Sequence, residues 1–276
     1  MTGTQLGAAA AAFDAAAASF DDRFAGWRSV AAQRAAVRVA LLAAFPAGAR
    51  VLELGGGNGA DAAWLAELGR DPVHTDPAPH MVALARQRLN GLVTEPPQVL
   101  AAEDLEAFAR RRTLAGEPPL DGAYSNFAAL NCVLDLRPVA RGLARLLRPG
   151  APALLVLFGT LPPGEVLVQL ARGEVRATVR RLARGPVTAR LCGQSFRIRY
   201  HRAREIRAAF GPWFRPGPRH GIGVFVPPSA AEPWISRRPR LLRALAALDR
   251  VASRPLAALG DHVLYRFVRT SAAVEA

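Results

Sequence analysis

The chain has 276 residues, enough for one large α/β domain with embellishments or for two small domains. Hydrophobic residues make up 51% and charged residues 21%, so we expect a packed core and exclude a wholly disordered chain. The 36 basic residues are all arginine and outweigh 22 acidic residues to give a formal charge of +14, which excludes catalytic lysine chemistry. An alanine-rich chain without lysine is typical of a GC-rich, bacterial genome, so this charge is weak evidence for a nucleic-acid partner.

The cysteine content and the N-terminus indicate a reduced, cytoplasmic protein. Cys132 and Cys192 are too few for a disulfide framework or a four-cysteine zinc site. The alanine run at 8–12 has no basic segment before it, and Asp14 follows closely, so we expect no signal peptide. No run of about 18 uncharged apolar residues predicts a membrane span.

The first half of the chain has the pattern of a parallel sheet. An amphipathic helix is expected at 32–45, ending at Pro46. Short apolar strands are then expected at 51–54, 71–76, 97–102, 121–126 and 151–159, with helices at 60–69, 78–89, 103–112 and 138–147. This alternation predicts a doubly wound α/β sandwich with helices on both faces of the sheet.

The second half of the chain interrupts this alternation of strands and helices and then resumes it. A helical pattern at 164–184 and a hairpin at 187–200, turning at 192–194, predict an inserted cap. The remaining elements are expected to complete the sheet: a helix at 203–210, a strand at 221–226, an arginine-studded helix near 239–252 and a last strand at 262–269.

A glycine-rich turn, VLELGGGNG at 51–59, lies where a strand ends and a helix begins. Gly55 and Gly57 permit a tight turn, Gly59 permits close packing of the helix, and Glu53 places a carboxylate at the mouth. The alternative is a merely tight strand-to-helix connection. The flanking elements favour a cofactor site.

Asp76 ends the second expected strand, 21 residues after Gly55. A carboxylate at this spacing can accept hydrogen bonds from both hydroxyls of a ribose, so adenosine is the expected ligand. A helix N-cap before Pro77 is an alternative role that could coexist with ribose binding.

The segments VLELGGGNG and HTDPAPHMVALAR resemble those of the class I S-adenosylmethionine-dependent methyltransferases, over about residues 13–160. The resemblance implies a Rossmann-like seven-stranded sheet in the order 3-2-1-4-5-7-6 with the last strand antiparallel. It also implies S-adenosylmethionine as cofactor and S-adenosylhomocysteine as product. On this basis we divide the chain into N-terminal helices or lid (1–48), cofactor-binding core (49–160), inserted cap (161–202) and completion of the core (203–276), with a second cap segment near 227–258.

The resemblance also implies roles for residues at the first three strands. Gly55, Gly57 and Gly59 would line the methionine and ribose portion, and Asp76 would bind the ribose hydroxyls. The adenine would contact Pro77 and Met81 on one face, and candidates near the third strand, where Ala101 replaces a frequent aspartate, are Ala102, Glu103 and Asp104. A solvated helix start is the alternative reading of these last three.

Two further segments match the family. SNFAALN at 125–131 follows the fourth strand, where Asn126 and Phe127 would hold the methionine end and face the methyl group; Asn58 and Asn131 would join them in one cleft, unless these asparagines simply favour turns. FDAAAASFDDRF at 13–24 resembles an N-terminal lid, with Phe20 where tyrosine is common; packing of an amphipathic helix is the alternative.

For catalysis we expect no metal, because the five histidines show no ligand spacing. His220, His201 and Tyr200 are the candidate bases, since the later strands and the cap should face the acceptor. A surface or capping role is the alternative for each histidine, and a thiolate or amine acceptor would need no base.

The acceptor is the least determined part. Residues 125–128 lack the N/D-P-P-Y/F motif of enzymes that methylate base amines, and a cap rich in Leu, Val, Trp213, Trp234 and Phe225 favours an enclosed apolar pocket. We therefore expect O-methylation of a small, largely apolar metabolite in specialised biosynthesis, by a monomer or homodimer. The alternatives are a lipid or isoprenoid acceptor at a membrane surface, contacted through the arginine-studded helices, RNA methylation, or a non-catalytic scaffold. A merely solvated face is the simpler explanation of those arginines.

Overall fold

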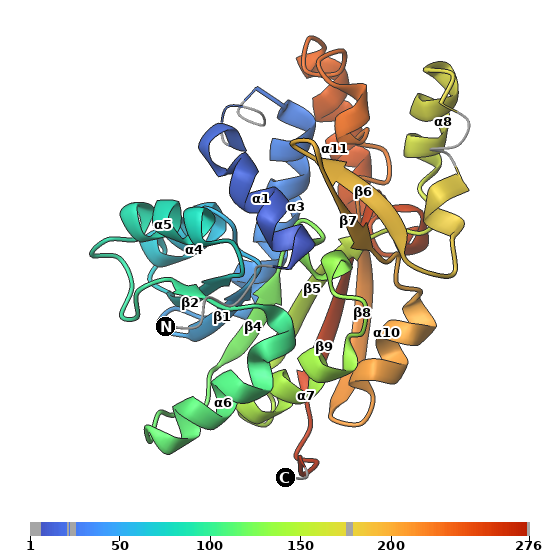
Figure 1. The fold of residues 1–276 in the computed structure, drawn as a ribbon. Coiled ribbons are helices and arrows are strands. Elements are labelled where there is room, and N and C mark those ends of the chain that lie inside the picture. The colour runs from blue at the N-terminus through green and yellow to red at the C-terminus, as the bar shows by residue number, and fades with distance from the viewer. Residues whose placement is uncertain (1–6, 21, 23–25, 175–178, 275–276) are drawn as a thin grey trace.

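The computed structural model describes residues 7–20, 22, 26–174 and 179–274. A seven-stranded sheet runs through the molecule in the order β3-β2-β1-β4-β5-β9-β8 (Figure 1). All neighbours among the first five strands pair in parallel, whereas β9 is antiparallel to both β5 and β8. The strands are β1 (Arg50–Leu54), β2 (Asp71–Asp76), β3 (Gln98–Val99), β4 (Gly122–Ser125), β5 (Pro152–Phe158), β8 (Phe214–Ile222) and β9 (His262–Arg269). The strand order and direction predicted from the sequence are confirmed.

Helices cover the two faces of the sheet. The α-helices are α1 (Ala8–Ala16), α3 (Arg28–Ala44), α4 (Ala60–Glu67), α5 (Pro79–Arg88), α6 (Leu105–Leu114), α7 (Arg137–Leu146), α8 (Pro163–Ala171), α10 (Ala203–Phe210) and α11 (Pro239–Ala252). The short 3-10 helices are η1 (Ala17–Ser19), η2 (Ala102–Asp104), η3 (Ala129–Cys132), η4 (Arg180–Leu182), η5 (Ser229–Ala231) and η6 (Ala257–Leu259). One apolar cluster joins α6, α7 and α10 to the sheet, and a second joins α3 to β1, β4 and β5.

The apolar pattern explains why these elements form. The interior of β5 is a continuous buried run, Ala153–Leu157, as expected for a strand covered on both faces. In α7, Val139, Leu143 and Leu146 recur at helical spacing and are buried together. Gly142 lies on the same helix and lets the Leu105 backbone at the start of α6 approach closely, because a Cβ there would lie 2.4 Å from the Leu105 Cβ.

Three expected boundaries were wrong. The strand expected at 221–226 is the end of β8, which begins at Phe214; after Ile222, Gly223 turns with a φ of +68° and the 225–226 backbone binds the Asp249 carboxylate. The strand expected at 97–102 pairs only over Gln98–Val99. The helix expected over 164–184 ends as α8 at Ala171, with η4 further on and residues 175–178 outside the described part.

Segments far apart in the sequence lie together above the sheet edge. The hairpin of β6 (Val187–Leu191) and β7 (Gln194–Ile198) forms at the expected position and packs against α1. Phe13 of α1 and Phe196 of β7 have ring centroids 5.9 Å apart. Asp14 ties the other side of α1 to α5, since it accepts hydrogen bonds from the His80 backbone and ring, each at 2.6 Å. Helix α1 is therefore held between the hairpin and α5 (Figure 1). Among the described residues, no helix is both long and apolar enough to cross a membrane.

The close approach of α6 and α7 leads to a test of packing. We expect Gly142→Ala to lower the free energy of unfolding by about 1–3 kcal/mol, because the added methyl group overlaps Leu105. Gly164→Ala in α8 is the matched control: its Cβ would meet Pro228 only at 3.8 Å, so the better helix propensity of alanine should stabilise it by up to about 1 kcal/mol. Urea unfolding measures both. Equal effects from the two substitutions would contradict the packing argument.

Candidate cofactor-binding site

The turn after β1 is built from glycines whose backbone other residues rarely adopt. Gly55, Gly57 and Gly59 have φ values of +63°, +57° and +77°. A Cβ on Gly57 would have no described atom within 4 Å, so this glycine borders open space, whereas one on Gly55 would lie 2.4 Å from the Ala129 Cβ. The Gly56 N–H donates to the Thr75 carbonyl at 3.1 Å, which fastens the turn to β2.

Asp76, at the end of β2, directs its carboxylate toward this turn. One oxygen accepts a hydrogen bond from the Gly57 N–H and the other from the Ala78 N–H, both at 2.8 Å. Burial raises the pKa of Asp76, and these two hydrogen bonds offset only part of that effect. Each oxygen retains a second lone pair, so the carboxylate can still accept from a pair of hydroxyl groups.

A buried ion pair supports the turn from below. The Nδ1 atom of His74 lies 2.6 Å from a carboxylate oxygen of Glu53, and its Nε2 lies 3.1 Å from the Gly57 carbonyl oxygen. Burial lowers the pKa of His74, but the hydrogen bond and charge of Glu53 outweigh it, so the pKa is raised. A Cβ on Gly56 would lie 2.3 Å from the Glu53 carboxylate. Gly56, for which the sequence analysis predicted no role, is thus required because a side chain would not fit beside this pair.

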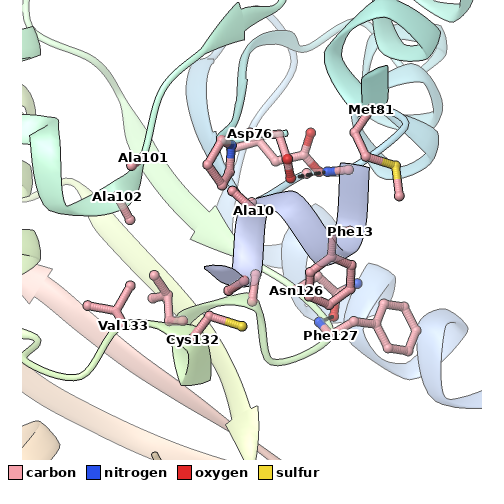
Figure 2. A pocket seen from close by; sticks show the side chains of 18 of the residues that line it. Ala10, Phe13, Asp76, Met81, Ala101, Ala102, Asn126, Phe127, Cys132 and Val133 are labelled. Atoms are coloured by element: carbon pink, nitrogen blue, oxygen red, sulfur yellow. Dashed lines mark hydrogen bonds between the residues drawn. The ribbon is translucent and has the colours of Figure 1, made fainter. Parts of the chain in front are cut away.

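A cavity of about 1140 Å³ opens over the turn (Figure 2). Thirteen of the cofactor-binding candidates predicted from the sequence line it: Phe20, Glu53, Gly55, Gly57, Asn58, Asp76, Pro77, Met81, Ala102, Glu103, Asp104, Asn126 and Phe127. Helix α1 forms another wall through Ala8–Ala10 and Phe13. Three residues of the 13–24 segment, Asp21, Arg23 and Phe24, lie outside the described part of the chain.

One end of the cavity is largely apolar. Ala101, Ala102 and Val133 line it, and the thiol of Cys132 lies beside Val133 (Figure 2). Burial raises the pKa of Cys132 to about 12, so this thiol stays protonated and is no nucleophile at neutral pH. Burial also raises the pKa of Glu103 at this end. A flat ring with a hydrogen-bonding edge suits these surroundings.

The other end of the cavity carries charged and strained groups. The Asn126 amide donates to Asp61 at 2.8 Å and its oxygen accepts from the Phe127 N–H at 2.8 Å. Phe127 and Ala128 have left-handed backbones with φ of +48° and +61°, a strain typical of functional sites. The Arg34 guanidinium lies 4.9 Å over the Phe127 ring, and its buried Nε has no hydrogen-bond partner among the described residues.

Two cofactor-binding candidates do not line the cavity. Gly59 faces α5 instead, where its Cβ position lies 3.1 Å from Ala85, so it permits helix packing rather than ligand contact. Asn131 is a structural bridge: its amide donates to the Arg199 carbonyl at 2.6 Å and its oxygen accepts from the Phe158 N–H at 3.0 Å.

The three predicted bases also lie outside the lining. His201 is buried, with Nε2 at 2.8 Å from the Val133 carbonyl, and burial lowers its pKa. Tyr200 is packed against Phe158 and Arg181 in the cap. His220 lies on β8, where Arg254 approaches its Nε2 at 3.1 Å. Each of the two histidines has a protein partner, so its presence has a structural explanation that does not require a catalytic role.

Several lining residues were not anticipated. Arg34, Asp61, Phe158, Asp261 and His262 line the cavity beside the charged end. His262 begins β9, and because β9 is antiparallel its first residue pairs with Phe158, the last residue of β5. A signal existed in the sequence, since His262 starts a clear strand, but only the strand direction brings it to this edge. Among the described residues, no group of three or more His, Cys, Asp or Glu side chains could hold a metal ion.

Residues 52–153 match a sequence family described as "Methyltransferase domain". The fold is that of the class I S-adenosylmethionine-dependent methyltransferases. No curated protein sequence matches the chain.

Solved structures show the same methyltransferase fold at low sequence identity. The DhpI–SAH complex is 16% identical and has a TM-score of 0.56, with 96% of each chain covered. The CcbJ methyltransferase from Streptomyces caelestis is 19% identical with a TM-score of 0.53, covering 87% of this chain and 90% of its own. A putative methyltransferase bound to the Trm112 activator from Haloferax volcanii is 18% identical with a TM-score of 0.53, covering 94% and 97%.

The buried pair below the turn predicts a pH-dependent contribution to stability. Because the folded pKa of His74 is raised above 6.5, its protonated form stabilises the fold below that pH, and this stabilisation is lost as pH rises through the raised value. We therefore expect Glu53→Gln to cost more unfolding free energy at about pH 6 than at about pH 9 in urea titrations.

A matched control for this pH dependence is Glu106→Gln. Glu106 pairs with Arg141 at 2.7 Å, and arginine keeps its charge over the whole range. Its cost should be the same at both pH values. A Glu53→Gln cost that is constant with pH would contradict the ion pair.

Proposed function

We propose that this protein is a methyltransferase that uses S-adenosylmethionine to methylate a small, largely apolar metabolite, with oxygen as the atom methylated. The observation that carries the proposal is the Asp76 carboxylate, fixed at 2.8 Å from the Gly57 N–H at the floor of the cavity. The fold alone would not suffice, because one fold hosts many activities. A buried acceptor beside open glycine backbone is what an adenosine ribose requires.

The residues present fit the three parts of S-adenosylmethionine. Asp76 would accept from the two ribose hydroxyls, and Pro77, Met81 and Ala102, which line the cavity, would contact the adenine, with Glu103 or Asp104 near its amino group. At the charged end, the Nε of Arg34 lies 3.8 Å from the Asp61 carboxylate but makes no hydrogen bond to a described residue, so it would donate to the carboxylate of the methionine portion.

When bound, S-adenosylmethionine supplies a methyl group already activated by its sulfonium charge. What the chain must add is alignment of the acceptor and exclusion of water. Helix α1 supports the second task, because its residues form a wall of the cavity and it is held on both sides by the hairpin and α5.

The size and lining of the cavity support a small acceptor. Small-molecule pockets are about 300–1000 Å³, so about 1140 Å³ leaves space for a second molecule beside the cofactor. Phe13, Phe20, Phe127 and Phe158 line it. We place the enzyme in specialised biosynthesis in the cytoplasm, as a monomer or homodimer.

One observation favours a second candidate, a lipid or isoprenoid acceptor reached at a membrane surface. Leu167 and Leu170 of α8 and Val251 of α11 are exposed, and arginines flank them. Both helices project at the top of Figure 1. Such mixed apolar and basic helices bind anionic lipid surfaces.

The substitution Asp76→Asn tests whether the Asp76 carboxylate binds the ribose hydroxyls. We expect S-adenosylmethionine to bind about 10–100-fold more weakly, since hydrogen bonds to a charged group contribute about 1.5–3 kcal/mol. Asp71→Asn is the control, because Asp71 begins the same strand, binds Thr94 and Arg50, and lies outside the cavity. Isothermal titration calorimetry of both variants and wild type checks this, and equal affinity in all three would contradict the assignment.

The function itself is tested with methyl-labelled S-adenosylmethionine. The wild-type protein is incubated with phenols, with extract and with vesicles containing anionic lipid and isoprenoid alcohols. Label in small organic-soluble products supports the proposal, and label only in the lipid fraction supports the second candidate. Failure of wild type to bind S-adenosylmethionine would overturn the enzyme function.

A further inference from the structure

We infer that His262, positioned by Asp261, is the general base of this site and that the acceptor is a phenol whose hydroxyl proton His262 removes. This inference rests on the proposed function and deepens it by naming the acceptor class. Three observations support it: the position of the imidazole in the cavity, its contact with Asp261, and the aromatic side chains around it.

Strand direction places His262 at the reactive edge. Because β9 runs antiparallel to β5, its first residue pairs with Phe158 at the end of β5. Both residues line the cavity. The His262 ring stacks on Phe158 with centroids 4.9 Å apart and meets the Phe127 ring edge-on at 6.1 Å. The Arg34 guanidinium lies 4.9 Å over the same Phe127 ring, so the imidazole and Arg34 share one aromatic neighbour.

Asp261 is a fixed, ionised partner for this imidazole. Its Oδ2 lies 3.3 Å from His262 Nδ1 and accepts from the Gln33 amide at 3.3 Å. Its Oδ1 accepts from Arg181 at 2.7 Å. Burial alone would raise the pKa of Asp261, but the neighbouring His262 imidazole and the Arg181 guanidinium outweigh it and hold the pKa well below its ordinary value.

Arg181 locks the carboxylate in place. It also donates to the Gly159 carbonyl at 3.1 Å and the Asp261 carbonyl at 2.7 Å, and it pairs with Glu165. Asp261 therefore cannot turn away from the imidazole. Asp261 is a positioning residue: it orients Nδ1 and stabilises the positive charge that His262 would gain.

Nδ1 of His262 is buried and forms an ion-pair contact with Asp261 at 3.3 Å without a hydrogen bond. The side chain lines the cavity, so Nε2, the ring nitrogen remote from Asp261, is the atom that we assign as the base. A base needs its acceptor atom unoccupied and within reach of the substrate proton. His220 and His201 fail the second part of this requirement, because neither lines the cavity.

The surroundings select an aromatic hydroxyl. Phe13, Phe127 and Phe158 offer faces and edges to a flat ring. A phenol has a pKa of about 10, within reach of an imidazole base, whereas thiols and amines can react without one. In the transfer step, the phenol oxygen forms the new C–O bond, the methyl–sulfur bond breaks with its electron pair going to sulfur, and the phenol proton goes to His262 Nε2.

The first test compares 4-methylphenol with 4-nitrothiophenol as acceptors, using wild type, His262→Gln and Asp261→Asn. The thiophenol is already ionised at neutral pH, so it needs no base. We expect His262→Gln to lower kcat for the phenol about 100-fold or more and to leave the thiophenol rate and S-adenosylmethionine affinity unchanged. Asp261→Asn should lower kcat for the phenol without raising its KM. His220→Gln, which the structure places outside the cavity, is the matched control.

The second test needs no turnover. 4-Nitrophenol is bound to the protein with S-adenosylhomocysteine, and its absorbance reports the phenolate, which absorbs at longer wavelength than the phenol. We expect the bound phenol to ionise at lower pH in wild type than in His262→Gln. Urea unfolding shows whether the variant is folded. Only folded variants are used in the spectroscopic comparison.

The outcomes separate the two proposals. Wild type that fails to bind S-adenosylmethionine overturns the proposed function. Wild type that binds it but methylates only the thiophenol, or a folded His262→Gln that methylates the phenol as fast as wild type, overturns the inference and leaves the function standing. Absence of any His262-dependent shift in the bound phenol also overturns the inference.

Discussion

The site depends on how the glycine turn is fastened to β2. Gly56 donates to the Thr75 carbonyl, Gly57 donates to Asp76, and His74 joins the Gly57 carbonyl to Glu53. Three successive residues at the end of β2 therefore hold two successive residues of the turn. Burying two carboxylates and an imidazole is costly unless each has a partner. Glu53 pairs with His74, and Asp76 accepts from two backbone N–H groups, so the turn keeps one conformation in which Gly57 borders open space.

Much of the fold could be predicted because its signals are local. Strands such as β2 and β9 and helices such as α10 and α11 have clear apolar periodicity and sharp ends. Strand β8 could not be predicted, because its first half is Arg215-Pro216-Gly217-Pro218-Arg219. Prolines are tolerated there since β8 is the edge strand and pairs only with β9, with a register shift between Pro216 and Arg219. The edge position of β8, which no local sequence pattern shows, therefore outweighed the low strand propensity of these residues.

The cofactor half of the cavity was predictable for the same reason, and the acceptor half was not. Gly55 and Gly57 belong to one short segment, and Asp76 follows it at a fixed spacing along the chain. His262 lies more than a hundred residues away from its neighbours Phe127 and Phe158, and it begins a strand rather than ending one. The rule that ligands gather at carboxyl ends of parallel strands excludes such a residue unless the antiparallel direction of β9 is taken into account.

The arginine content has a structural explanation as well as a genomic one. Arg181, Arg112 and Arg269 are buried, and each makes several contacts at once. Arg181 serves two carbonyl oxygens and two carboxylates, and Arg269 donates to the carbonyls of four residues. A lysine ammonium has three donors and no planar fork, so it could not replace either one. Some of the positive charges of this chain therefore lie inside the fold, where they have structural roles. Arg181, for example, fixes Asp261 and, through it, the imidazole of His262.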